Sequence, residues 1–149
     1  MKRTNHFLMF IFSLAIILVL CVKPGNKVQE SSSIRAAKGD TVWVVIYSIK
    51  PDKREQFENF FNVTFLPQFD KLTLNEQRAK NQTRMLYPVK ANEDGTYTYV
   101  LFMDPVVTGA DYSIESCLEK IYGKEKAKEY TKTLEQTFSK PGIKYDLIQ

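Results

Sequence analysis

The sequence predicts an α+β domain in which helices cover an antiparallel sheet, with the element order βαββαβ. Two segments, 41–49 and 96–103, are rich in β-branched and aromatic residues on both faces, as is typical of central strands. A stretch with apolar residues at helical spacing follows each of them. With 44% apolar residues, 10 Phe and 8 Tyr among 149 residues, the chain can fill the core of one such domain.

The first strand and the first helix are indicated by their apolar spacing. In 41–49, Val42, Val44 and Ile46 alternate with Trp43, Val45, Tyr47 and Ile49, so both faces are apolar and we expect a central strand in a sheet covered on both sides. Phenylalanines at 57, 60, 61 and 65 then predict an amphipathic helix. Pro67 should end or kink it, and 68–82 is expected to be a polar connection with one or two helical turns.

A hairpin is predicted next. Segments 84–90 and 96–103 flank the loop Ala91–Gly95, and its Asp-Gly ending is a strong turn signal. Because 84–90 contains Pro88 and two basic residues, it suits an edge of the sheet. The tyrosine-rich segment 96–103 suits the centre.

The remaining elements complete the order. An irregular stretch after Asp104 leads to a predicted helix over 113–122, with Asp111 or Ser113 as its N-cap and Cys117 buried on its apolar face. Gly123 interrupts this helix, and a second helical run is expected over 124–139. Pro141 and Gly142 then turn the chain into a half-exposed closing strand over 143–147.

This order is the split-βαβ or ferredoxin-like layout, whose first and third strands form the central pair. Its helices cover one face of the sheet, so an apolar second face needs another cover, and we expect a homodimer that packs through it. In order and size, residues 41–149 resemble the dimeric α+β barrel superfamily. That resemblance implies two sheets packed face to face. The superfamily includes cofactor-independent monooxygenases of the antibiotic-biosynthesis type and haem-degrading enzymes, so the resemblance implies these as possible activities.

Histidine chemistry is excluded from the predicted domain. The single histidine is His6, so residues 41–149 have no imidazole for a catalytic triad or a histidine metal site. The haem-degrading members of the superfamily use an Asn, Trp and His set, and this domain supplies Trp43 without any histidine. We therefore expect no cofactor and no metal.

The candidate ligand pocket is aromatic. Tyr97 and Tyr99 share one strand face, Trp43 and Tyr47 share a face of the neighbouring strand, and together they could line a pocket for a flat small molecule. The alternative is that they belong to the core or to a dimer interface. Two residues outside this set, Arg84 and Asp104, complete the candidate site: Arg84 as a cation for an acidic ligand, and Asp104 as the start of a loop, 104–112, suited to determining specificity.

The N-terminus predicts export. Lys2 and Arg3 precede an uncharged run, 7–22, so residues 1–22 are expected to be a signal or membrane-anchor segment and 23–40 a flexible tether. Cys21 at the end of this run resembles the lipidation site of a bacterial lipoprotein signal. An uncleaved helix anchor and simple secretion are the alternatives. Each of these places the domain outside the cytoplasm.

Charge excludes nucleic acid as a partner. Lys2 and Arg3 belong to the predicted signal or anchor segment. The rest of the chain carries 19 basic and 17 acidic residues, with no basic stripe interleaved with aromatic residues. Two functional hypotheses remain: a membrane-tethered, non-catalytic module that binds a ligand or partner, and a cofactor-independent monooxygenase-like enzyme for a small aromatic substrate. An enclosed cavity lined by Trp43, Tyr47, Tyr97 and Tyr99 would keep the enzyme hypothesis, and a solidly packed interior would favour the module.

Overall fold

The computed structural model describes residues 35–149. The predicted signal or anchor segment, Cys21 and most of the predicted tether lie outside the described residues. Among residues 35–149, no helix combines the length and the apolar character needed to cross a membrane.

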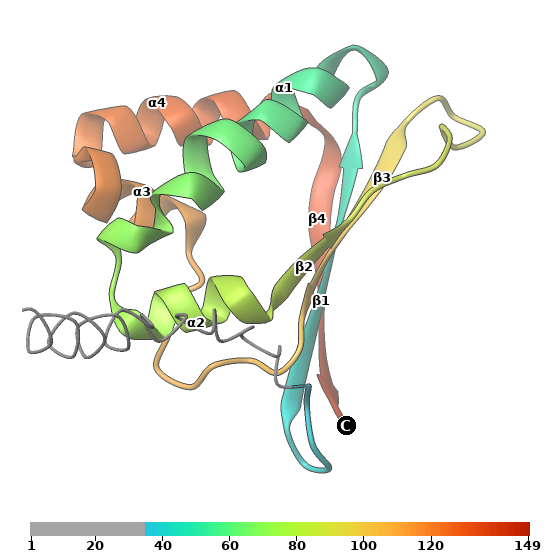
Figure 1. Cartoon of the computed structure of the whole chain (residues 1–149). Coiled ribbons are helices and arrows are strands. Elements are labelled where there is room, and N and C mark those ends of the chain that lie inside the picture. The colour runs from blue at the N-terminus through green and yellow to red at the C-terminus, as the bar shows by residue number, and fades with distance from the viewer. Residues whose placement is uncertain (1–34) are drawn as a thin grey trace, which may run out of the picture. The chain divides into compact units, whose positions relative to one another are not determined.

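A four-stranded antiparallel sheet forms one layer of the domain (Figure 1). Its strands are β1 (Thr41–Ile49), β2 (Thr83–Leu86), β3 (Tyr97–Met103) and β4 (Phe138–Ile148), in the spatial order β2-β3-β1-β4. This is the ferredoxin-like order, so the predicted α+β fold with β1 and β3 at its centre is confirmed.

Helices form the second layer, on one face of the sheet (Figure 1). The first crossover comprises η1 (Pro51–Lys53), α1 (Arg54–Asn59), a π-helical segment η2 (Phe60–Phe65), η3 (Leu66–Lys71) and α2 (Leu74–Gln82). The second comprises α3 (Ile114–Tyr122) and α4 (Lys124–Glu135). Ser113 caps α3 by accepting a hydrogen bond from the Ser116 backbone N–H, and Gly123 with φ +83° separates α3 from α4, both as predicted.

Several predicted boundaries are wrong. The second strand ends at Leu86 rather than residue 90, and Pro88, which has no backbone N–H to donate, lies just beyond it. Residues 74–82, expected to be mostly a polar connection, form a complete helix that starts with a capping box between Thr73 and Glu76.

The C-terminal boundary is also displaced. The last helix ends at Glu135 instead of residue 139, and β4 begins at Phe138 instead of residue 143. Thr137 ends the helix by donating its hydroxyl to the Leu134 carbonyl at 2.6 Å. Pro141 and Gly142 are tolerated inside β4 because this strand is a sheet edge with irregular pairing opposite Ser48.

Strand pairing assigns the two faces of the sheet. Trp43 lies opposite Met103 and Tyr47 opposite Tyr99, and these side chains pack towards the helices with the phenylalanines of the first crossover. On the other face, Val44 lies between Phe102 and Tyr145. The helices of residues 35–149 all lie on the first face, as predicted (Figure 1), and the expected cover of the second face by another copy stays a prediction.

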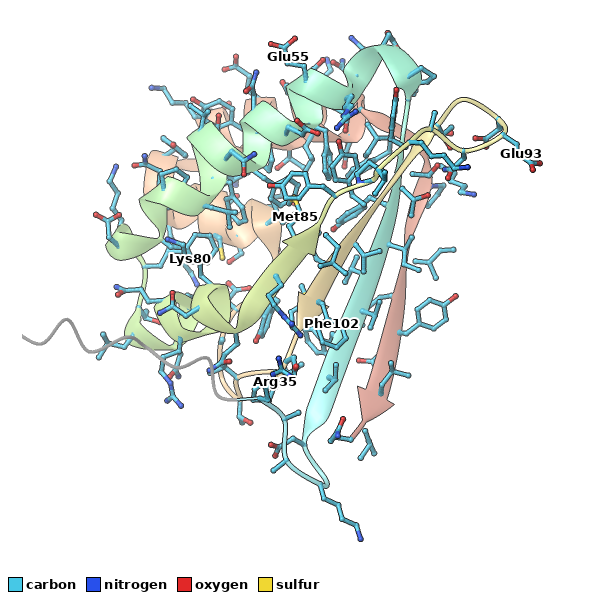
Figure 2. All side chains as sticks on the ribbon, turned by 45° about the vertical axis from the view of Figure 1, so that its right-hand side comes forward. Arg35, Glu55, Lys80, Met85, Glu93 and Phe102 are labelled. Carbon is cyan, nitrogen blue, oxygen red and sulfur yellow. The ribbon has the colours of Figure 1, made fainter. Side chains whose placement is uncertain are left out.

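The open face is apolar. Figure 2 labels Phe102 on this face of the sheet, and four large apolar side chains of the edge strands remain 46–53% exposed beside it: Leu86, Ile143, Tyr145 and Leu147. Between these two edge strands lie the partly buried Val44, Ile46, Val100 and Phe102 of the central strands, so the apolar surface extends across all four strands.

Candidate functional site

An apolar cavity of about 250 Å³ lies between the helix-facing side of the sheet and the helical layer. The sheet contributes Trp43, Val45 and Tyr47 from β1 and Leu101 and Met103 from β3. The opposite wall comes from η2, η3, α2, the 104–113 loop and α3, and its apolar residues are Phe65, Leu66, Phe69, Ala79, Tyr112, Ile114 and Cys117.

The local sequence explains why this space exists. Alternation along β1 directs its large side chains at 43, 45 and 47 towards the helices. The residues that approach from α2 and α3 at this depth include Ala79 and Cys117, both small and both buried. Two layers of secondary structure with short side chains between them leave a void rather than a filled core.

The ring of Tyr112 closes one side of the cavity. It meets Trp43 edge-to-face with 4.9 Å between ring centroids, and its hydroxyl accepts a hydrogen bond of 2.8 Å from the Val107 backbone N–H. The 104–113 loop is thus fastened across the end of β1 by its own tyrosine. Burial raises the pKa of the Tyr112 phenol, and the hydrogen bond from Val107 offsets part of this rise. Burial alone raises the pKa of Tyr47.

A hydrogen-bonded group of charges lies beside the cavity. The Lys120 ammonium is 2.8 Å from Glu76 Oε1 and 2.9 Å from Asp111 Oδ2, and Ser116 Oγ donates to the same Asp111 oxygen at 2.5 Å. The hydrogen bonds from Ser116 and Lys120 lower the pKa of Asp111 to about 2. This group joins α2, α3 and the 104–113 loop, so it holds the cavity wall together.

Basic side chains complete the lining. Lys144 on β4 lies over the Trp43 ring, with its nitrogen 3.7 Å from the ring centroid, and also pairs with Asp146 at 2.9 Å. Lys80 on α2 contributes a partly buried side chain, and Thr83 follows it at the start of β2. Figure 2 shows Lys80 on the side of α2 that faces the other helices.

Four groups in the cavity lining have shifted pKa values, and each shift is away from neutrality. Asp111 moves down to about 2, while burial raises the pKa of the Cys117 thiol to about 11. Tyr47 and Tyr112 move upward from an already high value. General acid–base catalysis near pH 7 is best served by a group whose pKa lies near 7.

The structure brings together half of the predicted aromatic set. Trp43 and Tyr47 line the cavity, whereas Tyr97 and Tyr99 share their sheet face but lie outside the lining. Tyr99 is fully buried against Phe57, with 4.6 Å between ring centroids, and its hydroxyl donates to the Glu58 carboxylate. Burial, followed by this contact, raises the pKa of Tyr99 to about 12.

The other predicted residues lie apart from the cavity. Tyr97 lies beneath the Arg54 guanidinium, 4.9 Å from ring centroid to carbon. Arg84 lies over Phe102 on the open face of the sheet and forms an ion pair of 3.1 Å with Asp104. Asp104 in turn accepts a hydrogen bond of 2.8 Å from the Ala36 backbone N–H, which ties the start of the described chain to the end of β3.

Besides the apolar walls, three polar lining residues were not predicted: Lys80, Thr83 and Lys144. Lys80 and Thr83 depend on α2, whose capping pattern Thr73-x-x-Glu76 is visible in the sequence and could have revealed the helix. Lys144 depends on the irregular pairing of β4, for which the sequence offers Pro141 and Gly142 as the only signal. Asp111 does come from the 104–112 segment in which determinants of specificity were expected.

A second, shallower hollow of about 700 Å³ lies on the open face of the sheet. It lies between the 90–98 turn and the start of β4, and Ile46, Thr98 and Ile143 form part of its floor. Its rim is polar, with the Asn92 amide donating to the hydroxyls of Thr96 and Thr98.

Within residues 35–149, no cluster of three or more His, Cys, Asp or Glu side chains could hold a metal ion.

The fold and the site define this domain as a ferredoxin-like α+β module with an apolar, aromatic cavity. No protein-family model matches the chain, and no curated protein matches its sequence. Two solved structures are similar, each named a "putative antibiotic biosynthesis monooxygenase". The one from Caulobacter crescentus CB15 has 17% identity and a TM-score of 0.39, over 75% of this chain and 91% of that chain. The one from Nitrosomonas europaea has 14% identity and a TM-score of 0.40, over 78% of this chain and 95% of that chain. At these values neither structure bears on the site, which is interpreted from this chain's own residues.

Proposed function

We propose that the domain is a non-catalytic module that binds a small apolar molecule in the cavity beside Trp43. The observation that carries this proposal is the cavity itself, about 250 Å³ in volume and lined mainly by aromatic and aliphatic side chains. An apolar cavity of about 150 Å³ stays dry and takes up benzene, so a space of this size suits a molecule of one or two rings. Hydrophobic transfer would supply most of the binding free energy.

Trp43 supplies the test, because it is the only tryptophan of the chain and lines the cavity. We expect 2-naphthalenemethanol, a neutral two-ring probe, to quench the Trp43 fluorescence of the full chain in a saturable manner. Ala79→Leu adds three carbon atoms to a buried wall of the cavity and should weaken this binding at least about tenfold, because no space remains for the ligand. Val45→Phe is a second filling variant.

Ala91→Leu is the matched control, since Ala91 lies in the hairpin loop away from this cavity. It should leave the quenching curve unchanged. Quenching that never saturates, or that is equal in wild type and in both filling variants while circular dichroism shows them folded, would contradict the proposal.

The alternative function is a cofactor-independent monooxygenase-like enzyme that acts on an aromatic molecule in the same space. The aromatic lining by Trp43, Tyr47 and Tyr112 favours it, whereas the pKa values of Asp111 and Cys117 favour simple binding. Consumption of dioxygen by the full chain with 1-naphthol, above the rate with the Ala79→Leu variant, would support the enzyme.

We also propose that the domain works as a homodimer that packs through the open face of the sheet. Support comes from the apolar side chains of four adjacent strands on that face, including Val44, Phe102 and Tyr145. A second copy of the same surface would bury them and would also close the shallow hollow next to Ile143.

The proposed cellular context is a membrane anchor with the domain outside the cytoplasm. It rests on the apolar run 7–22 and on Cys21 in the sequence. If Cys21 is lipidated, Cys21→Ser should abolish fatty-acid labelling and the change of mass on processing. Unchanged labelling and mature mass in this variant would instead favour the uncleaved helix anchor.

A further inference from the structure

Lys80 differs from the other charged residues of the cavity. It lies in the last turn of α2, is partly buried, and lines a cavity whose walls are mainly apolar. Within residues 35–149, no carboxylate or other acceptor pairs with its ammonium. Because the Lys80 side chain is only partly buried, water solvates its ammonium in the free protein, and an anion that enters the cavity would meet a cation that no carboxylate already holds.

The two other charged side chains of the lining are already compensated. Lys144 pairs with Asp146 at 2.9 Å and lies on the Trp43 ring. Asp111 is held by Lys120 at 2.9 Å and by Ser116 at 2.5 Å. The charges of Lys144 and Asp111 are therefore largely cancelled by those of their partners. Lys80 is the charged lining residue whose charge no ion pair among residues 35–149 compensates.

Cavity size and lining restrict the anion. A single ammonium matches a monoanion better than a phosphate, which usually recruits several donors. The rings of Trp43, Tyr47 and Tyr112 present flat apolar surfaces, and about 250 Å³ accommodates one or two fused rings with a small substituent.

We infer that the ligand of this cavity is a small aromatic carboxylate, whose ring system lies against Trp43 and whose carboxylate pairs with the Lys80 ammonium. This inference rests on the proposed binding function and specifies its ligand class. Hydrophobic transfer of the ring would supply the affinity, and the ion pair with Lys80 would select acids over neutral molecules of the same shape.

Two probes of equal ring size test the inference: 2-naphthoate and neutral 2-naphthalenemethanol. Their binding to the full chain, dispersed with phosphatidylcholine vesicles, is measured by Trp43 fluorescence, and vesicles without protein correct for partitioning. We expect wild type to prefer 2-naphthoate by about tenfold or more, which is the discrimination that one charge-assisted hydrogen bond provides.

Variants of Lys80 then separate charge from packing. Lys80→Met keeps an unbranched apolar stem but removes the charge, and should lower 2-naphthoate affinity at least about tenfold while leaving 2-naphthalenemethanol affinity unchanged. Lys80→Arg should retain the preference. Arg78→Met is the matched control on the same helix, since Arg78 is exposed and lies outside the cavity, and it should alter neither affinity.

Three results would overturn the inference. Equal binding of the two probes with no effect of Lys80→Met would show a neutral-ligand cavity in which Lys80 only extends to solvent, and would leave the proposed function intact. Loss of 2-naphthoate binding in Lys144→Met but not in Lys80→Met would move the anion site to Lys144. Failure of both probes to bind wild type would refute the proposed function and, with it, this ligand class.

Discussion

At the scale of single residues, Gly142 is fixed by the tyrosine ring beside it. A Cβ atom at this position would lie 2.8 Å from one carbon of the Tyr47 ring and 3.0 Å from another. That ring cannot move freely, because it stacks on Phe138 with 5.0 Å between centroids and an interplanar angle of 3°. The same ring lines the cavity, so the edge strand and the site are coupled through one glycine.

We therefore expect Gly142→Ala to destabilise the domain by about 1–3 kcal/mol, the usual cost of overpacking. Urea denaturation followed by circular dichroism measures it. In a Tyr47→Leu background the same substitution should cost much less, because the obstructing ring is gone. Equal costs in the two backgrounds would show that Tyr47 is not the obstacle.

Glu76 is a buried carboxylate that depends on two partners. Its side chain is only 4% exposed; Lys120 donates to one oxygen, and the Thr73 hydroxyl and backbone N–H donate to the other. Hydrogen bonds from Lys120 and then Thr73 lower its pKa below 4.5. A lowered carboxyl pKa means that this contribution to stability is fully present above about pH 4.5 and is lost as the pH falls through the folded-state pKa.

We expect Glu76→Gln to cost about 2 kcal/mol at pH 7, less than a fully buried pair because the Lys120 side chain is 42% exposed. The difference between wild type and variant in the free energy of unfolding should shrink as the pH is lowered from 6 towards 3. Glu119→Gln, at an exposed position of α3, is the control and should show little effect at either pH. A difference that stays constant with pH would contradict an ionised Glu76.

Two of the four predicted aromatic residues, Trp43 and Tyr47, line the cavity, and two do not, for a physical reason. Alternation along a strand fixes which face Trp43 and Tyr47 share, and the pairing of β1 with β3 confirms that Tyr97 and Tyr99 share it too. What alternation cannot supply is the position along the strand at which the helical layer leaves space. That depends on small residues such as Ala79 and Cys117 on two separate helices.

At the scale of elements, α2 shows why a part of the fold was missed. Its sequence, Leu-Asn-Glu-Gln-Arg-Ala-Lys-Asn-Gln, has almost no apolar periodicity, and Leu74 is 77% exposed. The helix is held instead by its capping box, by the Glu76–Lys120 ion pair and by burial of the small Ala79. Periodicity therefore predicted the phenylalanine-rich helix and failed for the helix that is held by polar contacts.

The central strand β1 permits a test of its two faces. Val45 packs with the helix-side core and lines the cavity, whereas its neighbour Val44 lies on the open face between Phe102 and Tyr145. We expect Val45→Glu to destabilise the domain by about 2 kcal/mol or more, because it places a carboxylate against the apolar core, where the cross-strand Lys144 is already paired with Asp146. Val44→Glu should cost the folded monomer no more than about 1 kcal/mol.

Thermal unfolding followed by far-ultraviolet circular dichroism distinguishes the two variants. Val45→Glu should lose its cooperative transition or show a greatly lowered midpoint, and Val44→Glu should unfold cooperatively. Val45→Thr, which keeps the shape without a charge, is the control for the helix-facing position. The opposite ranking of the two glutamate variants would mean that the faces of β1 are assigned the wrong way round.

At the scale of the whole molecule, the layer order and strand order could be predicted because each depends on long apolar patterns that recur along the chain. The two doubly apolar segments became β1 and β3, the central pair, and helices covered one of their faces. The edges were predicted less well. β2 is shorter and β4 longer than their patterns indicated, since an edge strand is bounded by proline placement and irregular pairing rather than by burial.

The open face leads to the prediction about assembly. Leu86, Ile143, Tyr145 and Leu147 stay 46–53% exposed around Phe102, and a face-to-face partner of typical size would bury about 1,200–2,000 Å² in total. At ~25 cal/mol per Å² of apolar area, the free energy of burying a well-packed interface of that kind can exceed the cost of association.

We expect residues 35–149 to have the mass of a dimer by light scattering at tens of micromolar, and Val44→Glu to reduce this mass to that of a folded monomer. Lys126→Glu, on the exposed surface of α4, is the control and should stay dimeric. A monomeric mass for the wild type across this concentration range would refute the dimer, and the apolar face would then need cover from a different partner.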